Sequence, residues 1–162
     1  MSCVCYVSIG SNIDPKRHVK QALVDLTACF GILQQSPIYE TQAVGFDGDN
    51  FYNLVIGFQT DLSVGDLSQQ LSQIEQNNGR ERNAQRFNAR TLDLDLLLYG
   101  DAILTKEGFN IPRDEIAKYA FVLKPLVDLN PQGLHPETKV AYCDLWAMMK
   151  TQTTDLVEVT LD

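Results

Sequence analysis

The chain has 162 residues, a length that fits one folded domain of ordinary size. Hydrophobic residues make up 44% of it and charged residues 21%, a balance that excludes a disordered or low-complexity protein. The formal net charge is −8, and a net-negative chain is a poor candidate for coating nucleic acid. We therefore expect one globular unit over 1–162 that does not bind nucleic acid.

The apolar runs and the cysteines indicate the cellular location of the protein. No apolar run approaches the roughly 18 residues that span a bilayer, and the start of the chain shows no secretory signal. The four cysteines, Cys3, Cys5, Cys29 and Cys143, do not have the spacing of a zinc site. Reduced thiols without a secretory signal are typical of the cytoplasm, so we expect a cytoplasmic protein that does not bind membranes.

Strand and helix signals alternate over the first half of the chain. The expected elements are strands over 3–9, 32–39 and 51–58 and helices that begin at Asp14-Pro15 and near Ser63. Gly10-Ser11-Asn12 reads as a turn, and Pro37 indicates a sheet edge or a bulge. Residues 41–50, which include two glycines, are expected to form a loop.

The second half begins with a loop that leads into an apolar strand over 91–99. Beyond Pro112 the pattern becomes helical and irregular, with one further helix around 141–149. The order β-α-β-β-α-β up to residue 99 matches the split βαβ plan. The predicted fold class is α+β: a ferredoxin-like βαββαβ core whose mostly antiparallel sheet is covered by helices.

Two aspartates share one face of the strand over 91–99. Read with a period of two, Leu92, Leu94 and Leu96 face one way and Asp93 and Asp95 face the other. Their Cα atoms are about 6.6 Å apart, so their carboxylates can converge on a hard cation such as Mg²⁺. The alternative is a solvated polar face, but aspartate is disfavoured in strands and like charges repel. A divalent metal removes both objections.

Arginines gather just before this strand. Four of the six in the chain, Arg80, Arg82, Arg86 and Arg90, fall within eleven residues. Guanidinium groups bind phosphate oxygens in a bidentate fork, and arginines beside carboxylate-bound magnesium are typical of phosphoryl transfer. The chain has neither a P-loop nor a GxGxxG fingerprint, so the common nucleotide-binding folds are not expected.

Aromatic residues offer the second half of a site. Phe51 and Asn53 open the third expected strand, and Phe121 lies in the irregular region after Pro112. Either phenylalanine taken alone is better explained as part of the core than as a ligand-binding residue.

Taken together, these residues resemble the 6-hydroxymethyl-7,8-dihydropterin pyrophosphokinase family of the folate pathway. The resemblance runs from Tyr6 to Pro136, and its most specific element is the segment Arg90-Thr91-Leu92-Asp93-Leu94-Asp95-Leu96-Leu97-Leu98-Tyr99-Gly100. It implies transfer of the β,γ-diphosphate of ATP, as one unit, to the hydroxymethyl oxygen of the pterin. It also implies ATP and a hydroxymethyl-dihydropterin as ligands, two magnesium ions, and a monomer.

The resemblance also implies roles for individual residues. The implied metal ligands are Asp93 and Asp95, and the implied catalytic residues are Arg80, Arg90 and Asp95, with Asp95 nearest the attacking hydroxyl. The implied ATP-binding residues are Glu75, Arg82 and Arg90. We also expect Arg86 to bind ATP because it belongs to the arginine cluster, and Arg113 because its charge can replace that of the family's arginine at the position of Tyr119. The implied pterin-binding residues are Thr41, Val44, Phe51, Asn53 and Phe121, of which Phe51 and Phe121 sandwich the ring.

The chain departs from the family pattern on the ATP side. Phe87-Asn88-Ala89 stands where the family has Trp-Gly-Pro, and Gln42-Ala43 replaces a pair of prolines. Arg113 stands where a histidine is usual, and Tyr119 stands where an arginine is usual. The alternatives are therefore a paralogue that uses another reduced pterin and a catalytically idle module that binds a pterin or a nucleotide.

Overall fold

The computed structural model of the chain describes residues 2–42, 49–79, 91–149 and 156–161. The strands are β1 (Cys3–Ser11), β2 (Gln34–Gln35), β3 (Ile38–Thr41), β4 (Phe51–Thr60), β5 (Asp93–Tyr99) and β6 (Val157–Val159). The helices are α1 (Pro15–Phe30), α2 (Val64–Asn77), α3 (Glu115–Lys118), α4 (Ala120–Leu129) and α5 (Tyr142–Met149).

The strands form one antiparallel sheet in the order β5-β1-β4-β3-β6, and β2 also pairs with β4. The connection through α1 leads from β1 across β4 to β2 and β3, and the connection through α2 leads from β4 across β1 to β5. These two crossovers give the sheet the strand order of a ferredoxin-like fold. The predicted fold class is confirmed.

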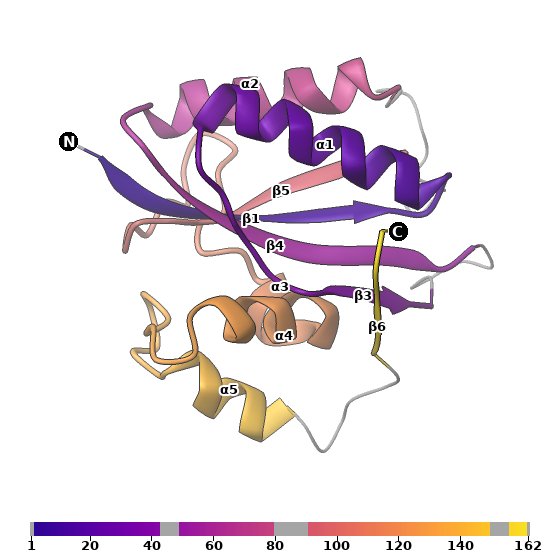
Figure 1. The fold of residues 1–162 in the computed structure, drawn as a ribbon. Helices are drawn as coiled ribbons and strands as arrows, with labels where there is room; N and C mark the ends of the chain where they lie inside the picture. Colours follow the sequence, from indigo (N-terminus) through magenta and orange to yellow (C-terminus); the bar gives the residue numbers. More distant parts are fainter. Residues whose placement is uncertain (1, 43–48, 80–90, 150–155, 162) are drawn as a thin grey trace.

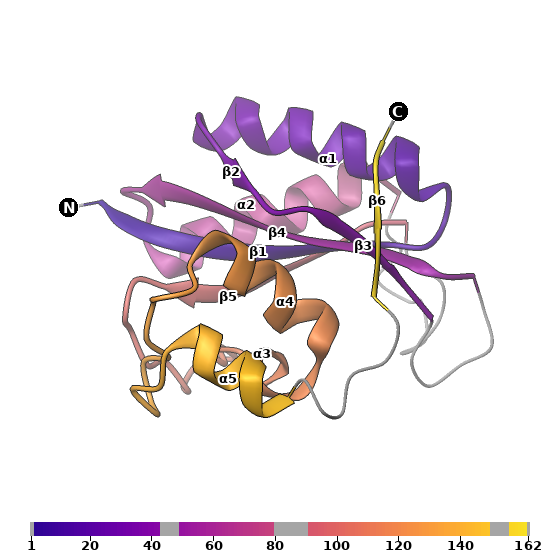
Figure 2. The ribbon, with the colours of Figure 1, turned by 60° about the horizontal axis from the view of Figure 1, so that its bottom comes forward.

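Helices cover both faces of the sheet (Figure 1). On one face α1 and α2 pack on alternate residues of the central strands, including Val7, Ile9, Leu54 and Ile56, all of which are buried. On the other face α3, α4 and α5 form a second core around Val55. Figure 2 shows α4 running across this second face.

Both expected helices begin where the sequence predicts, but only α2 has a side-chain cap. Asp14, expected to cap α1, makes no side-chain hydrogen bond to the backbone of the first turn of that helix. Pro15 is the first residue of α1, where its missing N–H costs nothing because no intrahelical partner exists there. At α2 the Ser63 hydroxyl accepts a hydrogen bond from the Asp66 amide, 3.1 Å away.

The second expected strand is interrupted. At Ser36-Pro37 the chain leaves the ladder between β2 and β3, because proline has no N–H to donate. The Ser36 hydroxyl accepts a hydrogen bond from the Val55 amide (2.9 Å), and the Ser36 amide donates to the Val55 carbonyl (3.0 Å). The break thus stays tied to β4, which agrees with the bulge or edge predicted at Pro37.

Three expectations need correction. Gly10 and Ser11 belong to β1 and not to a turn, because both pair with β4. Thr41 lies in β3, whereas we expected it to open a loop. Phe121 lies in a regular helix, α4, although the surrounding sequence looked irregular because Pro125 interrupts the helical pattern.

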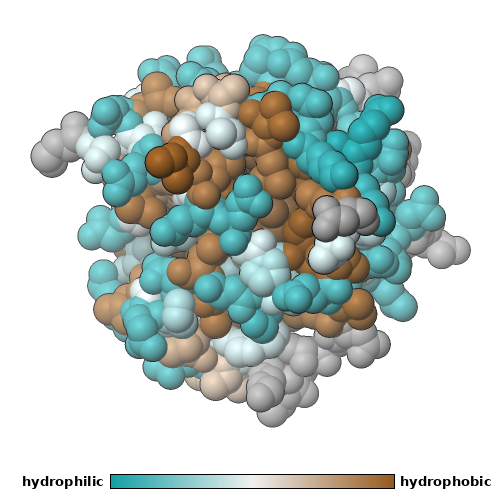
Figure 3. All heavy atoms as spheres, viewed as in Figure 1, coloured by the Kyte–Doolittle hydropathy of each residue, from teal (hydrophilic) through white to brown (hydrophobic). Residues whose placement is uncertain are grey.

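Among the described residues, no helix is both long and apolar enough to cross a bilayer. Figure 3 shows that hydrophilic side chains cover much of the viewed face, while apolar ones reach the surface mainly across its middle. Exposed apolar side chains such as Val24 and Ile32 are normal on a folded domain.

Candidate active site

The two aspartates predicted to bind metal lie on the edge strand β5, on the sheet face that α3, α4 and α5 partly cover. Leu92, Leu94 and Leu96 belong to the opposite core, with α1 and α2, and are buried. Asp93 and Asp95 alternate with these leucines and are half-buried. The predicted separation of apolar and acidic side chains onto two faces is confirmed.

One transverse row of the sheet joins the predicted metal ligands to the predicted pterin residues. Gly10 of β1 pairs with Asp93 of β5 on one side and with Asn53 of β4 on the other, and Asn53 pairs with Tyr39 of β3. Residues paired directly across neighbouring strands point to the same face. Neighbouring strands lie about 4.8 Å apart, so the backbones of Asp93 and Asn53 are about 10 Å apart.

Gly10 keeps the centre of this row open. A side-chain carbon added to Gly10 would lie 3.4 Å from Asn53 Oδ1 and 3.9 Å from Phe51 Cδ1. Any larger side chain would therefore extend over the sheet between the aspartates and Asn53. The glycine leaves a floor of bare backbone at that point.

The predicted pterin residues that the structure describes on β3 and β4 come together. Asn53 Nδ2 donates a hydrogen bond to Thr41 Oγ1 (2.8 Å), and both side chains are buried. Phe51 pairs with Thr41 across the same two strands and is half-buried. The bond to Thr41 fixes the orientation of the Asn53 amide. Val44 lies outside the described residues.

Phe121, the fourth predicted pterin residue described here, is the second residue of α4. Its ring stacks on Tyr119, with ring centroids 5.0 Å apart and planes inclined by 19°. Offset stacking of this kind restricts both rings. Tyr119, which stands where the family has an arginine, therefore supports the predicted ring-binding aromatic.

Glu75, predicted to lie on the nucleotide side, supports the strand that carries the aspartates. It lies on α2 and is buried, and its Oε2 accepts a hydrogen bond from the Leu94 amide (2.7 Å). This bond satisfies a backbone donor on an edge strand, midway between Asp93 and Asp95.

Arg113 approaches the acidic pair directly. Its Nη2 lies 3.4 Å from Asp95 Oδ1, and its Nε lies 3.3 Å from Glu115 Oε2. Its amide donates to the Leu97 carbonyl of β5 (3.1 Å), which ties this segment to the strand. The guanidinium thus offsets part of the negative charge at Asp95.

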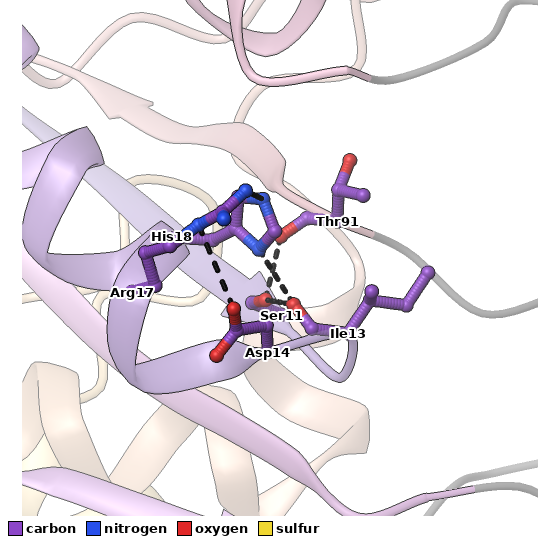
Figure 4. Close-up of polar contacts among 6 residues, drawn as sticks. All are labelled: Ser11, Ile13, Asp14, Arg17, His18 and Thr91. Atoms are coloured by element: carbon purple, nitrogen blue, oxygen red, sulfur yellow. Dashed lines mark hydrogen bonds and ion pairs between the residues drawn. The ribbon is translucent and has the colours of Figure 1, made fainter.

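Arg80, Arg82, Arg86 and Arg90 lie outside the described residues, and their predicted roles stay predictions. The residue that follows them is firmly held: the buried Ser11 hydroxyl donates to the Thr91 carbonyl (2.5 Å), as Figure 4 shows. In the same view the His18 ring contacts the Ile13 carbonyl through Nδ1 (2.6 Å) at the start of α1. The beginning of β5 is thereby anchored to the end of β1.

Sequence reasoning missed Gly10, Ser11 and Tyr39 as parts of this site. Gly10 and Ser11 carry a local sequence signal, but that signal predicts a turn. Tyr39 carries none, because its place beside Asn53 follows only from the register of β3 against β4.

The donors present fit magnesium. Asp93 and Asp95 offer only carboxylate oxygens, and magnesium is typically bound by one or two carboxylates together with substrate phosphates and water. Among the residues that the structure describes, no three or more histidine, cysteine or acidic side chains form a denser cluster. The site therefore suits a cation that arrives with a phosphate ligand.

The fold and the site together define a class: an α+β domain with a carboxylate pair and a cluster of aromatic and amide side chains on one sheet face. A sequence model of the 7,8-dihydro-6-hydroxymethylpterin-pyrophosphokinase family matches residues 6–131. The chain is 35% identical over 147 residues to the 2-amino-4-hydroxy-6-hydroxymethyldihydropteridine pyrophosphokinase of Pseudomonas aeruginosa, covering 85% of this chain and 90% of that protein.

Longer relatives contain the same domain. The folic acid synthesis protein fol1 of Schizosaccharomyces pombe is 36% identical over 139 residues, which cover 83% of this chain but only 19% of that protein. The crystal structure of wild-type Plasmodium falciparum HPPK-DHPS with pteroate is similar in fold, with a TM-score of 0.73 at 12% identity, covering 94% of this chain and 44% of that one. The chain thus spans less than half of these longer proteins.

The chain belongs to the 7,8-dihydro-6-hydroxymethylpterin-pyrophosphokinase family. This is a family of ATP-dependent diphosphotransferases.

Proposed function

We propose that this chain transfers the β,γ-diphosphate of ATP, as one unit, to the hydroxymethyl oxygen of 6-hydroxymethyl-7,8-dihydropterin. The pterin oxygen bonds to the β-phosphorus, the bond from that phosphorus to the α-phosphate oxygen breaks, and the hydroxyl proton is released. The products are AMP and the pterin diphosphate, an intermediate of folate biosynthesis.

The observation that carries this proposal is the row Asp93–Gly10–Asn53. It places a carboxylate pair suited to phosphate-bound magnesium about 10 Å, two strand spacings, from an amide suited to a pterin edge. The side-chain-free Gly10 between them leaves room for the hydroxymethyl group and the phosphate it attacks. Both halves of the reaction therefore share one continuous surface.

On the pterin side, Asn53 and Thr41 present a fixed pair of polar groups to the ring edge. Phe51 and Phe121 supply aromatic faces, each worth roughly 0.5–1.5 kcal/mol of stacking beyond simple burial. The ring is thus held flat, with its hydroxymethyl group directed along the row towards β5. Val44 is assigned to the same pocket by family resemblance alone.

On the phosphate side, Asp93 and Asp95 would together hold two magnesium ions. Of the two carboxylates, that of Asp95 would lie nearer the attacking hydroxyl. When bound, magnesium neutralises charge on the phosphate oxygens. Arg113 adds a fixed positive charge beside Asp95, and Glu75 keeps β5 in place. Arg80, Arg82, Arg86 and Arg90 are assigned to the phosphates by their residue type and by family resemblance.

The test is formation of AMP, measured by chromatography, from ATP, magnesium and 6-hydroxymethyl-7,8-dihydropterin. We expect AMP to form only when the pterin carries the hydroxyl, so 6-methyl-7,8-dihydropterin should give none. Formation of ADP in place of AMP would contradict the proposal. Binding of both ligands without AMP would instead identify an idle binding module.

A further inference from the structure

A polar network joins β3 to α4 beside the ring-binding residues. The Tyr39 hydroxyl donates a hydrogen bond to Asp128 Oδ2, and Lys124 Nζ bonds to the other carboxylate oxygen of Asp128. The Lys124 ammonium also lies 5.8 Å from the centre of the Tyr39 ring and 6.0 Å from that of Trp146 on α5. Residues of β3, α4 and α5 therefore meet around Lys124.

The hydrogen bond between Tyr39 and Asp128 is partly buried. Tyr39 is only 7% exposed, and the Asp128 side chain is 19% exposed. Burial, together with the Asp128 carboxylate, raises the pKa of Tyr39 above its ordinary value, so the hydroxyl stays protonated and can donate. A hydrogen bond to a charged acceptor contributes more than one between neutral groups.

Asp128 and Phe121 lie on the same helix, α4. They are seven residues apart, which is about two helical turns, so they share one face of the helix. Pro125 lies between them and has no N–H for the Phe121 carbonyl, so the first turns of α4 are weakly held by the helix itself. The height and rotation of Phe121 above the sheet must then be set largely by tertiary contacts such as this one.

The other end of the network lies in the ring-binding row. Tyr39 pairs with Asn53 across β3 and β4, on the same sheet face. One side chain therefore stands next to the amide that recognises the ring and also holds the helix that carries the aromatic above it. This is the arrangement needed to fix the width of a slot for a flat ring.

We propose that Tyr39 and Asp128 are positioning residues for the pterin slot. Their hydrogen bond sets the gap between Phe121 on α4 and the floor formed by Asn53 and Phe51. The inference rests on the proposed function, and it assigns Lys124 the task of balancing the Asp128 charge.

The experiment measures the affinity of the full chain for fluorescent 6-hydroxymethylpterin at saturating α,β-methylene ATP and magnesium. We expect Tyr39→Phe and Asp128→Asn to weaken pterin binding five- to thirty-fold, with the affinity for the ATP analogue within two-fold of the wild type. Asp128→Asn keeps the size of the side chain. If Tyr39→Phe does not fold, the pterin affinity of Asp128→Asn tests the inference in its place.

Tyr99→Phe is the matched control. Tyr99 also donates its hydroxyl across elements, to the Leu62 carbonyl (2.5 Å), but it lies at the far end of β5 from Asp93. We expect this variant to lose thermal stability as Tyr39→Phe does, while pterin affinity stays within two-fold. If Tyr99→Phe weakens pterin binding as much as Tyr39→Phe does, the effect comes from a general loss of stability. That result would contradict the inference.

A double-mutant cycle with Phe121→Ala tests whether Tyr39 acts through that ring. If it does, adding Tyr39→Phe to Phe121→Ala should change pterin affinity by less than two-fold, because there is no aromatic left to position. Full additivity would overturn the inference. If the wild type and Tyr39→Phe bind pterin equally well, the inference is overturned but the proposed function is not. If the wild type binds no pterin, the proposed function is overturned.

Discussion

At the scale of single residues, the proposed function makes phosphate binding depend first on Asp93 and Asp95. We expect Asp93→Asn and Asp95→Asn each to lower magnesium-dependent affinity for α,β-methylene ATP at least ten-fold and to abolish AMP formation. The reason is that an amide oxygen is a weaker magnesium ligand than a carboxylate. The free energy of unfolding should change by no more than about 1 kcal/mol. Either change relieves repulsion between like charges on one strand face, but Asp95→Asn also weakens the ion pair with Arg113.

Calorimetry measures the affinity, and chemical denaturation measures the stability. Asp101→Asn is the control, since Asp101 is an exposed aspartate in the turn that follows β5. Affinity for the ATP analogue within two-fold of the wild type in either β5 variant would place the metal elsewhere.

Arg113 is the described cation nearest to the carboxylate pair. Because it lies 3.4 Å from Asp95 and cannot lose its charge, we expect it to contact phosphate oxygens held by the metal. Arg113→Ala should weaken binding of α,β-methylene ATP with magnesium at least ten-fold, as measured by calorimetry. Arg17→Ala, which removes an exposed arginine paired with Asp14, should leave that affinity unchanged. Unchanged affinity in Arg113→Ala would mean that the arginine serves only to balance Asp95.

At the scale of an element, the segment between α4 and α5 is built around a neutral histidine. His135 Nδ1 accepts hydrogen bonds from the amides of Glu137 (3.2 Å) and Thr138 (3.4 Å). Burial lowers the pKa of His135 below its ordinary value of 6.5. A protonated Nδ1 could accept neither bond.

Acid should therefore destabilise the protein through His135. Since its folded pKa is lower than its unfolded pKa, the unfolded chain binds more protons just below pH 6.5, and the free energy of unfolding falls as pH falls. We expect His135→Asn, whose amide oxygen can still accept, to lose less stability between pH 7 and pH 5.5 than the wild type does. Urea titrations at both pH values measure this, and equal losses would contradict it.

The sequence predicts a helix or strand well where a local hydrophobic pattern determines it. It predicts an element less well where pairing with a distant strand determines it. The alternation over 92–96 correctly separates leucines from aspartates, but Leu97 and Leu98 are both buried in the second core because the register of β5 shifts opposite Tyr6 and Val7. The three-residue strand β6 escaped prediction, because it is a strand only through its pairing with β3. No local pattern encodes either event.

The site divides in the same way. The residue types at 93, 95, 51 and 53 indicate metal and ring chemistry from the sequence alone. The row that joins them through Gly10, and the contact of Arg113 with Asp95, depend on register and on a long-range connection. Such contacts are properties of the assembled sheet.

At the scale of the whole molecule, the fold brings together segments that are far apart in the chain. Residues near 10, 40, 53 and 94 meet on one sheet face, and α4 closes over part of it. The helices α1 and α2 on the opposite face supply the larger core, which leaves this face free to carry polar groups. The central claim is that pterin and phosphates lie side by side on this face.

That claim is tested most directly by the distance between the metal and the pterin hydroxymethyl group. With Mn²⁺ in place of Mg²⁺ and α,β-methylene ATP bound, paramagnetic relaxation of the hydroxymethyl protons of 6-hydroxymethylpterin reports that distance by NMR. We expect strong relaxation, consistent with a separation within about 10 Å, two strand spacings, and its loss in Asp95→Asn. Absence of relaxation while both ligands are bound to the wild type would contradict the account.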